Sequence, residues 1–312
     1  MQEKKTEYCR RMEWLRKEAE QRYLALKFTD DFLFCKILEE HPDIAKELVE
    51  LILNRSIQKV VVKKQEAIEL TSDGKGIRLD VYVEEEEDTI YDLEMQTTNK
   101  PNLPKRSRYY QGMIDLNTIR RGEKYETLRK TYIIFICMKD PFGYGNHIYS
   151  FENRCKEIPG LLFGDDTYKI ILNASGTKAD VSEKMLDFFE MLKTGRGKTA
   201  FAQKIEREVE RAKNHEEWRM EYMTLFMRDE EKKEEGRAEG RAEGRAEGRA
   251  EGRAEGRAEG VAGAILELLS ELGPIPENIK DFIQSEKDLA VLNQLLKKAA
   301  KCKTIEEFKD FL

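Results

Sequence analysis

Two short acidic segments decide the fold of this chain: Arg78-Leu79-Asp80-Val81-Tyr82-Val83 and Tyr91-Asp92-Leu93-Glu94-Met95-Gln96. An acidic stretch at residues 85–88 separates them, so the pair predicts a β-hairpin. If the turn is centred on Glu87, Asp80 lies directly opposite Glu94. Side chains alternate between the two faces of a strand. The alternation predicts one apolar face and one polar face: Leu79, Val81, Val83, Leu93 and Met95 on the first, and Asp80, Glu94 and Gln96 on the second.

Opposed carboxylates in this register suggest a metal site. Directly opposed residues have Cβ atoms about 4.5–5.5 Å apart, and like charges placed there repel each other. A hard divalent cation that accepts carboxylate oxygens relieves that repulsion. Asp80 and Glu94 together therefore predict a small metal site, whereas either of them taken alone would more often be a solvated strand carboxylate.

Composition describes a highly charged chain with an uneven charge distribution. The 312 residues leave room for one domain of about 150–200 residues plus appendages. Charged residues make up 37% of the chain, and the net charge of −6 excludes a general polycation. Between Lys100 and Lys130, nine Lys or Arg residues stand against three acids. This local basic field can attract a polyanion.

The cysteines and the apolar runs indicate an intracellular protein. Five cysteines are scattered without a CxxC pair, and no histidine stands at ligand spacing, which argues against a zinc site or a disulfide framework. The first 20 residues have no apolar core typical of a signal peptide. The longest apolar run, residues 132–138, is too short to cross a bilayer. We therefore expect a cytoplasmic location and no membrane partner.

Hydrophobic periodicity predicts helices and strands in an order typical of a mixed α/β layer fold. The strand at 131–138 has the profile of a buried central strand. An acidic capping box at residues 180–183 begins the last of these helices. Helices are expected at 3–27, from 28–34 onward, at 43–53, 105–117 and 180–192, and strands at 59–63, 77–84, 90–97, 131–138, 147–151 and 168–172.

The C-terminal third consists of a charged segment, a repeat and an apolar module. Gly-Arg-Ala-Glu occurs six times, from Gly236 to Glu259. A four-residue period stacks like charges at i,i+4, and each glycine costs a helix about 1 kcal/mol relative to alanine. This favours a flexible spacer over a partly helical ensemble, and the paired glutamates disfavour an RNA-binding arginine tract. Residues 261–312 regain apolar periodicity, with a capping box at Thr304, and predict a helical interaction or assembly module.

The spacing Asp-(x)13-Glu-x-Gln, between a preceding helix and a basic, tyrosine-containing helix, resembles the PD-(D/E)xK nuclease superfamily. More specifically, the chain is similar to the Rpn family of recombination-promoting nucleases and putative transposases. The resemblance runs from about Phe28 to Leu312. The segments that carry it are Phe28-Thr29-Asp30-Asp31-Phe32-Leu33-Phe34, Arg78-Leu79-Asp80-Val81, Asp92-Leu93-Glu94-Met95-Gln96, Arg106-Ser107-Arg108-Tyr109-Tyr110 and the Gly-Arg-Ala-Glu tail.

The resemblance implies an α/β fold with a restriction-endonuclease-like core, a mixed sheet flanked by helices. A charged helical region, the repeat spacer and a small all-α C-terminal module follow the core. The expected parts are an N-terminal amphipathic helix at 1–27, the nuclease-like domain at 28–199, the charged segment at 200–235, the repeat linker at 236–260 and the helical module at 261–312.

The activity implied is that of a metal-dependent DNA endonuclease linked to recombination, mobile elements or defence. Asp80 and Glu94, with the main-chain carbonyl of Met95, would hold Mg²⁺ or Mn²⁺, which activates a water for attack on phosphorus. Gln96 stands where the superfamily has lysine, and a neutral amide can orient water but cannot act as a base. The alternative for Gln96 is an ordinary edge-strand polar group.

The basic helix supplies the expected DNA contacts, since arginine grips phosphate bidentately. The alternative is a helix with a polar face and core tyrosines, which we favour for at least one tyrosine. Glu47 could add a third carboxylate, although an exposed helical glutamate is favoured there. The residues considered for DNA contact or for the missing positive charge are Lys100, Lys105, Arg106, Arg108, Tyr109 and Tyr110.

A second class of function stays open, in which the chain is a catalytically weak DNA-binding or partner-binding protein that acts through its C-terminal module. Self-association through that module would make it a homo-oligomer. No nucleotide cofactor is expected, because the repeat glycines lack the Gly-Lys-Ser/Thr ending of a phosphate loop.

Overall fold

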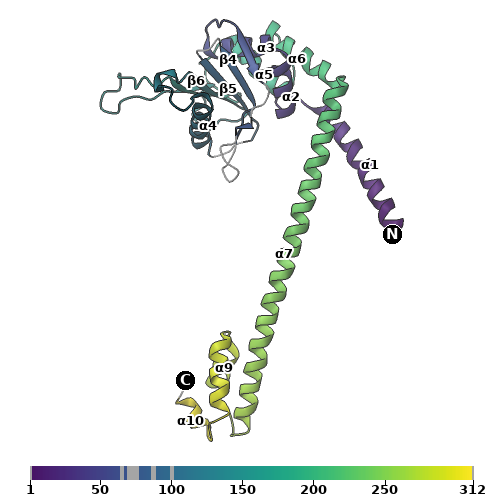
Figure 1. Cartoon of the computed structure of the whole chain (residues 1–312), viewed down its shortest axis with the longest axis vertical. Coiled ribbons are helices and arrows are strands. Elements are labelled where there is room, and N and C mark those ends of the chain that lie inside the picture. The colour runs from purple at the N-terminus through teal and green to yellow at the C-terminus, as the bar shows by residue number, and fades with distance from the viewer. Residues whose placement is uncertain (1, 64–66, 69–76, 86–88, 99–101, 311–312) are drawn as a thin grey trace. The chain divides into compact units, whose positions relative to one another are not determined.

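The structure is a computed structural model that describes residues 2–63, 67–68, 77–85, 89–98 and 102–310. The chain divides into two compact units, Met1–Met227 and Arg228–Leu312. No described helix combines the length and the apolar character needed to span a membrane. The first unit contains these elements (Figure 1): α1 (Gln2–Ala25), α2 (Asp31–Glu40), α3 (Pro42–Leu53), β1 (Val60–Lys63), β2 (Ala67–Ile68), β3 (Ile77–Arg78), β4 (Val81–Glu85), β5 (Thr89–Gln96), α4 (Leu103–Thr118), the 3₁₀ turn η1 (Tyr125–Thr127), β6 (Lys130–Cys137), β7 (Ile148–Phe151), β8 (Thr167–Asn173), α5 (Glu183–Thr194), α6 (Ala200–Lys213) and the start of α7 (Glu216–Ser270).

A six-stranded mixed sheet forms the centre of this unit, in the order β1-β4-β5-β6-β8-β7. The strands β1, β4 and β5 pair antiparallel, β6 runs parallel to both β5 and β8, and β7 returns antiparallel to β8. The expected central strand is therefore β6, in the same sheet as the hairpin. A mixed sheet flanked by helices agrees with the expected core.

Helices cover the two faces of the sheet unequally (Figure 1). On one face, the odd-numbered side chains of β5 enter a large apolar core with α2, α3, α5 and α6. On the other face, α4 is the helix that packs over Ile90, Ile133 and Phe135 in the described part of the chain. Because β5 alternates, its even-numbered side chains all point to the α4 side. This side therefore receives every acidic residue of β5.

The strand expected at 77–84 is interrupted, which corrects one part of the hairpin prediction. The chain bends at Leu79 and Asp80, between β3 and β4. Leu79 consequently packs in the α4-side core, whereas Val81 and Val83 belong to the opposite core as expected. Strict alternation fails at Leu79 because a bend resets the direction of the side chains.

The start of α5 differs from the expected capping box. Ser182, not Asp180, is the N-cap residue, and its hydroxyl accepts the main-chain N–H of Met185 (3.3 Å). Asp180 instead accepts the main-chain N–H of His147 (2.9 Å), and its other oxygen lies 2.8 Å from Nδ1 of the same histidine. The carboxylate thus connects the segment before α5 to the start of β7.

The Gly-Arg-Ala-Glu repeat is helical and lies wholly within α7, which differs from the flexible spacer favoured by the sequence. Buried residues anchor α7 on both sides of the repeat: Trp218 in the first unit, and Ile265 and Leu269 in the second. Starting a helix is the costly step, and extending one is much easier. The repeat therefore continues a helix whose ends are held by packing, a contribution that is missing when the segment is considered in isolation.

The second unit is a small helical module with a core of its own. Its helices are the end of α7, α8 (Glu277–Ser285), α9 (Leu289–Ala299) and α10 (Ile305–Lys309). The apolar core includes Ile279, Leu292 and Phe308, all fully buried. At the start of α10, the Thr304 hydroxyl accepts the N–H of Glu307 (3.3 Å), as the capping pattern predicts.

Candidate functional site

The register of the hairpin brings Asp80 and Glu94 together. The ladder runs from Glu85–Thr89 to Val81–Leu93, and Asp80 and Glu94 are the residues that follow its last pair. The main-chain N–H of Asp80 donates to Glu94 Oε1 (3.1 Å), and the N–H of Met95 donates to Asp80 Oδ2 (3.1 Å). Each carboxylate is thus fixed by the main chain of the opposite segment. The backbone of Met95, whose carbonyl was expected to assist, lies directly beside Asp80.

Arg106 of α4 reaches down to the same pair of strands. Its guanidinium donates to Gln96 Oε1 (2.6 Å), to Glu94 Oε2 (3.3 Å) and to the hydroxyl of Tyr110 (3.0 Å). The guanidinium carbon also lies 5.3 Å from the ring centroid of Phe135. Gln96 turns its amide nitrogen the other way, to the main-chain oxygen of Thr98 (2.7 Å). The expected site residues Glu94, Gln96 and Arg106 therefore form one hydrogen-bonded group.

Asp92 is an acidic residue of this region that the sequence reasoning missed. It precedes Glu94 by two residues on β5, points to the α4 side and is 0% exposed. Neither of its carboxylate oxygens has a hydrogen-bond partner in the described part of the chain. The signal was present in the sequence, since the alternation that groups Glu94 with Gln96 also includes Asp92.

Burial and mutual repulsion make these carboxylates hard to ionise. Burial raises the pKa of Glu94 well above its ordinary value, and the negative charges of Asp92 and Asp80 raise it further. Burial likewise raises the pKa of Asp92, with Asp80 adding to the effect and Arg106 opposing it. Several acids that resist ionisation at one place are typical of a site that holds a cation or a proton.

The donor set fits a hard divalent cation. Mg²⁺ and similar ions take carboxylate and carbonyl oxygens, which Asp80, Glu94 and Met95 present at adjoining positions. Arg106 donates to Glu94 but not to Asp92, whose two oxygens have no hydrogen-bond donor among the described residues. Within the described ranges, no three His, Cys, Asp or Glu side chains are already gathered as a ligand set.

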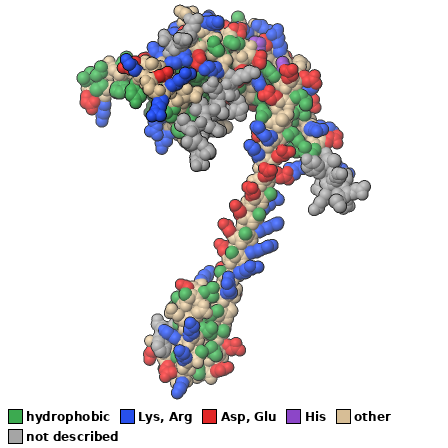
Figure 2. Space-filling view, in the orientation of Figure 1, with side chains coloured by type: hydrophobic (Ala, Val, Ile, Leu, Met, Phe, Trp, Pro, Cys, Tyr) green, Lys and Arg blue, Asp and Glu red, His purple; other side chains and the backbone are tan. Residues whose placement is uncertain are grey.

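The expected DNA-contacting residues divide into two groups. Lys105, Arg108 and Tyr109 lie exposed on α4, whereas Arg106 and Tyr110 turn towards the sheet. The ring centroid of Tyr110 is 6.1 Å from that of Phe135, so this is the tyrosine that packs against the core. Lys100 lies outside the described residues. Figure 2 shows Lys and Arg side chains gathered on the part of the first unit that carries α4.

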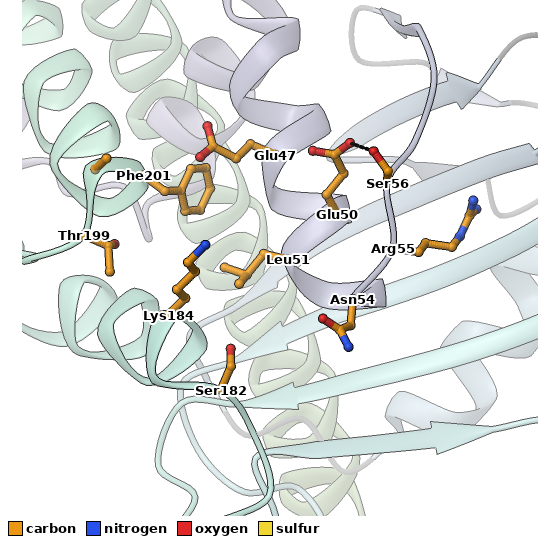
Figure 3. Close-up of a pocket in the computed structure, with 11 residues that line it drawn as sticks. Glu47, Glu50, Leu51, Asn54, Arg55, Ser56, Ser182, Lys184, Thr199 and Phe201 are labelled. Atoms are coloured by element: carbon orange, nitrogen blue, oxygen red, sulfur yellow. Dashed lines mark hydrogen bonds between the residues drawn. The ribbon is translucent and has the colours of Figure 1, made fainter.

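Glu47, considered as a third carboxylate, is not brought to Asp80 and Glu94. Its helix α3 packs on the opposite face of the sheet, where Glu47 lines a cavity of about 570 Å³ together with Lys184 and Phe201 (Figure 3). Glu47 accepts a hydrogen bond from Lys204 of α6 (3.4 Å), which also contacts Asp43 (2.7 Å). The further carboxylate near Glu94 is instead Asp92, two residues before it on β5.

A mixed sheet, two acidic residues in contact at the β4–β5 hairpin and a basic helix above them are the arrangement that the resemblance to the PD-(D/E)xK nucleases predicts. Residues 28–157 match the family model of the PD-(D/E)XK nuclease family transposase. This match confirms the resemblance seen in the sequence for that part of the chain. Comparisons with curated proteins and with solved structures gave no match.

Proposed function

We propose that the first unit is a metal-dependent DNA endonuclease that acts in recombination or in the movement of, or defence against, mobile DNA. The observation that carries the proposal is the contact between Asp80 and the Glu94–Met95 segment, made by two main-chain hydrogen bonds to the two carboxylates. The family match over residues 28–157 supports a nuclease or transposase-like activity for the domain that contains this pair.

Asp80, Glu94 and the carbonyl of Met95 would hold Mg²⁺ or Mn²⁺. A cation bound there supplies a Lewis acid for the phosphate and lowers the pKa of a water. The protein itself fixes the direction of the ligands, because the N–H of Met95 and the N–H of Asp80 restrain one oxygen of each carboxylate. Oriented ligands are the means by which a protein selects the coordination geometry of its metal.

Arg106 takes over the charge that lysine supplies elsewhere in the superfamily. Gln96 is neutral, but its carbonyl oxygen receives the Arg106 guanidinium at 2.6 Å. This contact places a permanent positive charge beside Glu94, next to the position where a phosphate would lie. Arginine does not lose its proton in proteins, so Arg106 acts as a charge and a donor and not as a base.

The exposed face of α4 would bind the phosphate backbone. Lys105 and Arg108 project from the same helix whose inner side carries Arg106. Contacts of this kind position DNA without reading its sequence. The helix thus joins DNA binding on its outer side to the carboxylate pair on its inner side.

Incubation of purified full-length protein with supercoiled plasmid tests the activity. We expect nicking or linearisation in the presence of Mg²⁺ or Mn²⁺, none in excess EDTA, and no need for ATP. Cleavage by wild-type protein at an undiminished rate in EDTA would contradict the proposal. Equal cleavage by an Asp80→Ala variant would show that the activity comes from another site or from a contaminant.

A further inference from the structure

A buried acid without a partner needs something from outside the protein to satisfy it. Asp92 is 0% exposed, and both of its oxygens lack a hydrogen-bond donor in the described part of the chain. An ionised carboxylate in an apolar interior without compensation is strongly unfavourable. Its neighbours across the sheet are Tyr82 on β4 and Ile133 on β6, both buried. The fold therefore buries the Asp92 carboxyl group without a hydrogen-bond donor from the described residues.

Asp92 lies beside the carboxylate pair and on the same face. Same-face residues along a strand are separated by about 6.5 Å, and Glu94 is the next same-face residue after Asp92. A cation with oxygen ligands at about 2.0–2.6 Å can be shared across such a spacing, because the two side chains reach towards each other. Asp80, in the bend just before β4, donates its main-chain N–H to Glu94 Oε1 (3.1 Å). Asp92 and Asp80 therefore flank Glu94 beneath α4, and the three carboxylates form a ligand set only when their side chains turn towards one ion.

The charges of the three acids and Arg106 also match a divalent ion. Within the described residues, Arg106 is the cation that contacts Glu94, at 3.3 Å. Three ionised carboxylates and one guanidinium leave two negative charges, which one divalent cation neutralises.

We propose that Asp92 is a direct carboxylate ligand of the divalent cation held by Asp80 and Glu94, and that the metal site has three carboxylate ligands instead of two. The inference rests on the proposed function, since it assigns a further ligand to the same cation. In the structure, Asp80 accepts a hydrogen bond from the main chain, and Glu94 accepts one from the main chain and one from Arg106. Binding therefore requires the carboxylates to rotate towards the ion.

Titration of full-length protein with Mn²⁺, followed by the electron paramagnetic resonance signal of the free ion, measures this role without any DNA. We expect Asp92→Asn to weaken Mn²⁺ binding about tenfold or more, in the range found when the support of a metal site is removed. Asp115→Asn is the matched control. Asp115 is a half-buried aspartate of α4 whose charged neighbours are Lys169 and Asp165, so its variant should bind Mn²⁺ as wild type does.

The outcomes separate this inference from the proposed activity. If wild type binds Mn²⁺ and Asp92→Asn binds it equally well, Asp92 is not a metal ligand, while the nuclease proposal stands. If wild type binds no Mn²⁺, both fail. A crystal structure of wild type with Mn²⁺ located by anomalous scattering needs no variant and decides the matter even if Asp92→Asn does not fold. An Asp92 oxygen within about 2.6 Å of the ion supports the inference, and one beyond 4 Å overturns it.

Discussion

Arg106 connects the helix that would bind DNA to the acids that would hold the metal. Its guanidinium contacts Gln96, Glu94 and Tyr110, and lies over the ring of Phe135. A lysine in its place could not make this planar set of contacts, because it carries a single ammonium group. The neutral Gln96 and the charged Arg106 therefore form one hydrogen-bonded unit, which we propose acts together.

The first prediction concerns this unit. Arg106→Gln removes the donors to Gln96 and Glu94, and we expect the cleavage rate at saturating DNA to fall about 10–100-fold. Arg108→Gln, an exposed change on the same helix, should weaken DNA binding and leave the rate at saturating DNA close to that of wild type. Single-turnover cleavage and binding titrations measure the two effects. Wild-type cleavage by Arg106→Gln would remove Arg106 from the mechanism.

The contact between Asp80 and Glu94 could be predicted from the sequence because the position of the turn determines the register of a hairpin. Asp80 opposite Glu94 follows from a turn centred on Glu87, and the ladder from Val81–Leu93 to Glu85–Thr89 has that register. Leu79 was misplaced because the bend before β4 does not follow the alternation. The hydrogen bonds of Arg106 could not be predicted, since they depend on how α4 packs across the sheet.

Among the elements, the segment before α5 is connected to the start of β7 by the Asp180 carboxylate, which contacts His147. Burial acts to raise the pKa of Asp180, but hydrogen bonds from the His147 ring and main chain outweigh it and hold that pKa below its usual range. A carboxylate with a lowered pKa in the folded state contributes stability above its ordinary pKa of about 3.9. This contribution disappears as the pH falls through the lower, folded-state pKa.

The second prediction follows from the lowered pKa of Asp180 in the folded protein. Thermal unfolding of wild type and Asp180→Asn should show a wild-type advantage at pH 5 that shrinks steadily towards pH 2. Asparagine has nearly the same shape but no charge to titrate, so the difference isolates the carboxylate. A difference in melting temperature that stays constant over this range would contradict the assigned cause.

The helix α7 gives the third prediction, because alanine fits at its repeat glycines. A Cβ added at Gly244 or Gly248 meets no atom within 4 Å. Replacing glycine by alanine inside a helix stabilises it by about 1 kcal/mol, so amide exchange near each site should slow about fivefold. Hydrogen exchange by mass spectrometry measures the effect in full-length protein.

Gly195 provides the control for these substitutions. It ends α5 with a φ of +78°, where a Cβ also meets no atom within 4 Å. The left-handed backbone alone makes alanine unfavourable there. Gly195→Ala should therefore destabilise the protein, and faster exchange in α7 after Gly244→Ala would contradict a helical repeat.

For the whole molecule, each unit has its own apolar core. The buried residues of Met1–Met227 form clusters on the two faces of the sheet, and those of Arg228–Leu312 form a separate cluster. The sequence predicted the two cores well, since both show strong apolar periodicity. It did not predict the continuous helix through the repeat, because helix anchoring at both ends is a property of the tertiary structure.

The fourth prediction is that residues 1–235 form a folded and active fragment. The carboxylate pair and α4 lie wholly inside it, so cleavage per molecule should stay within a few-fold of that of the full-length chain. We also expect the C-terminal helices to mediate self-association, because so small a core is marginal when alone. Light scattering coupled to gel filtration compares the two proteins. An unchanged oligomeric state would refute the assembly role.

The most direct test of the central claim is single-turnover cleavage measured in parallel with DNA binding. We predict that Asp80→Ala and Glu94→Ala each lower the Mg²⁺-dependent cleavage rate by about a hundredfold or more and change DNA affinity little, because carboxylates repel phosphate. Glu84→Ala, which alters a glutamate of β4 paired with Lys63 and Arg129, is the control and should cleave like wild type. Cleavage by Asp80→Ala or Glu94→Ala at the rate of Glu84→Ala would contradict the account.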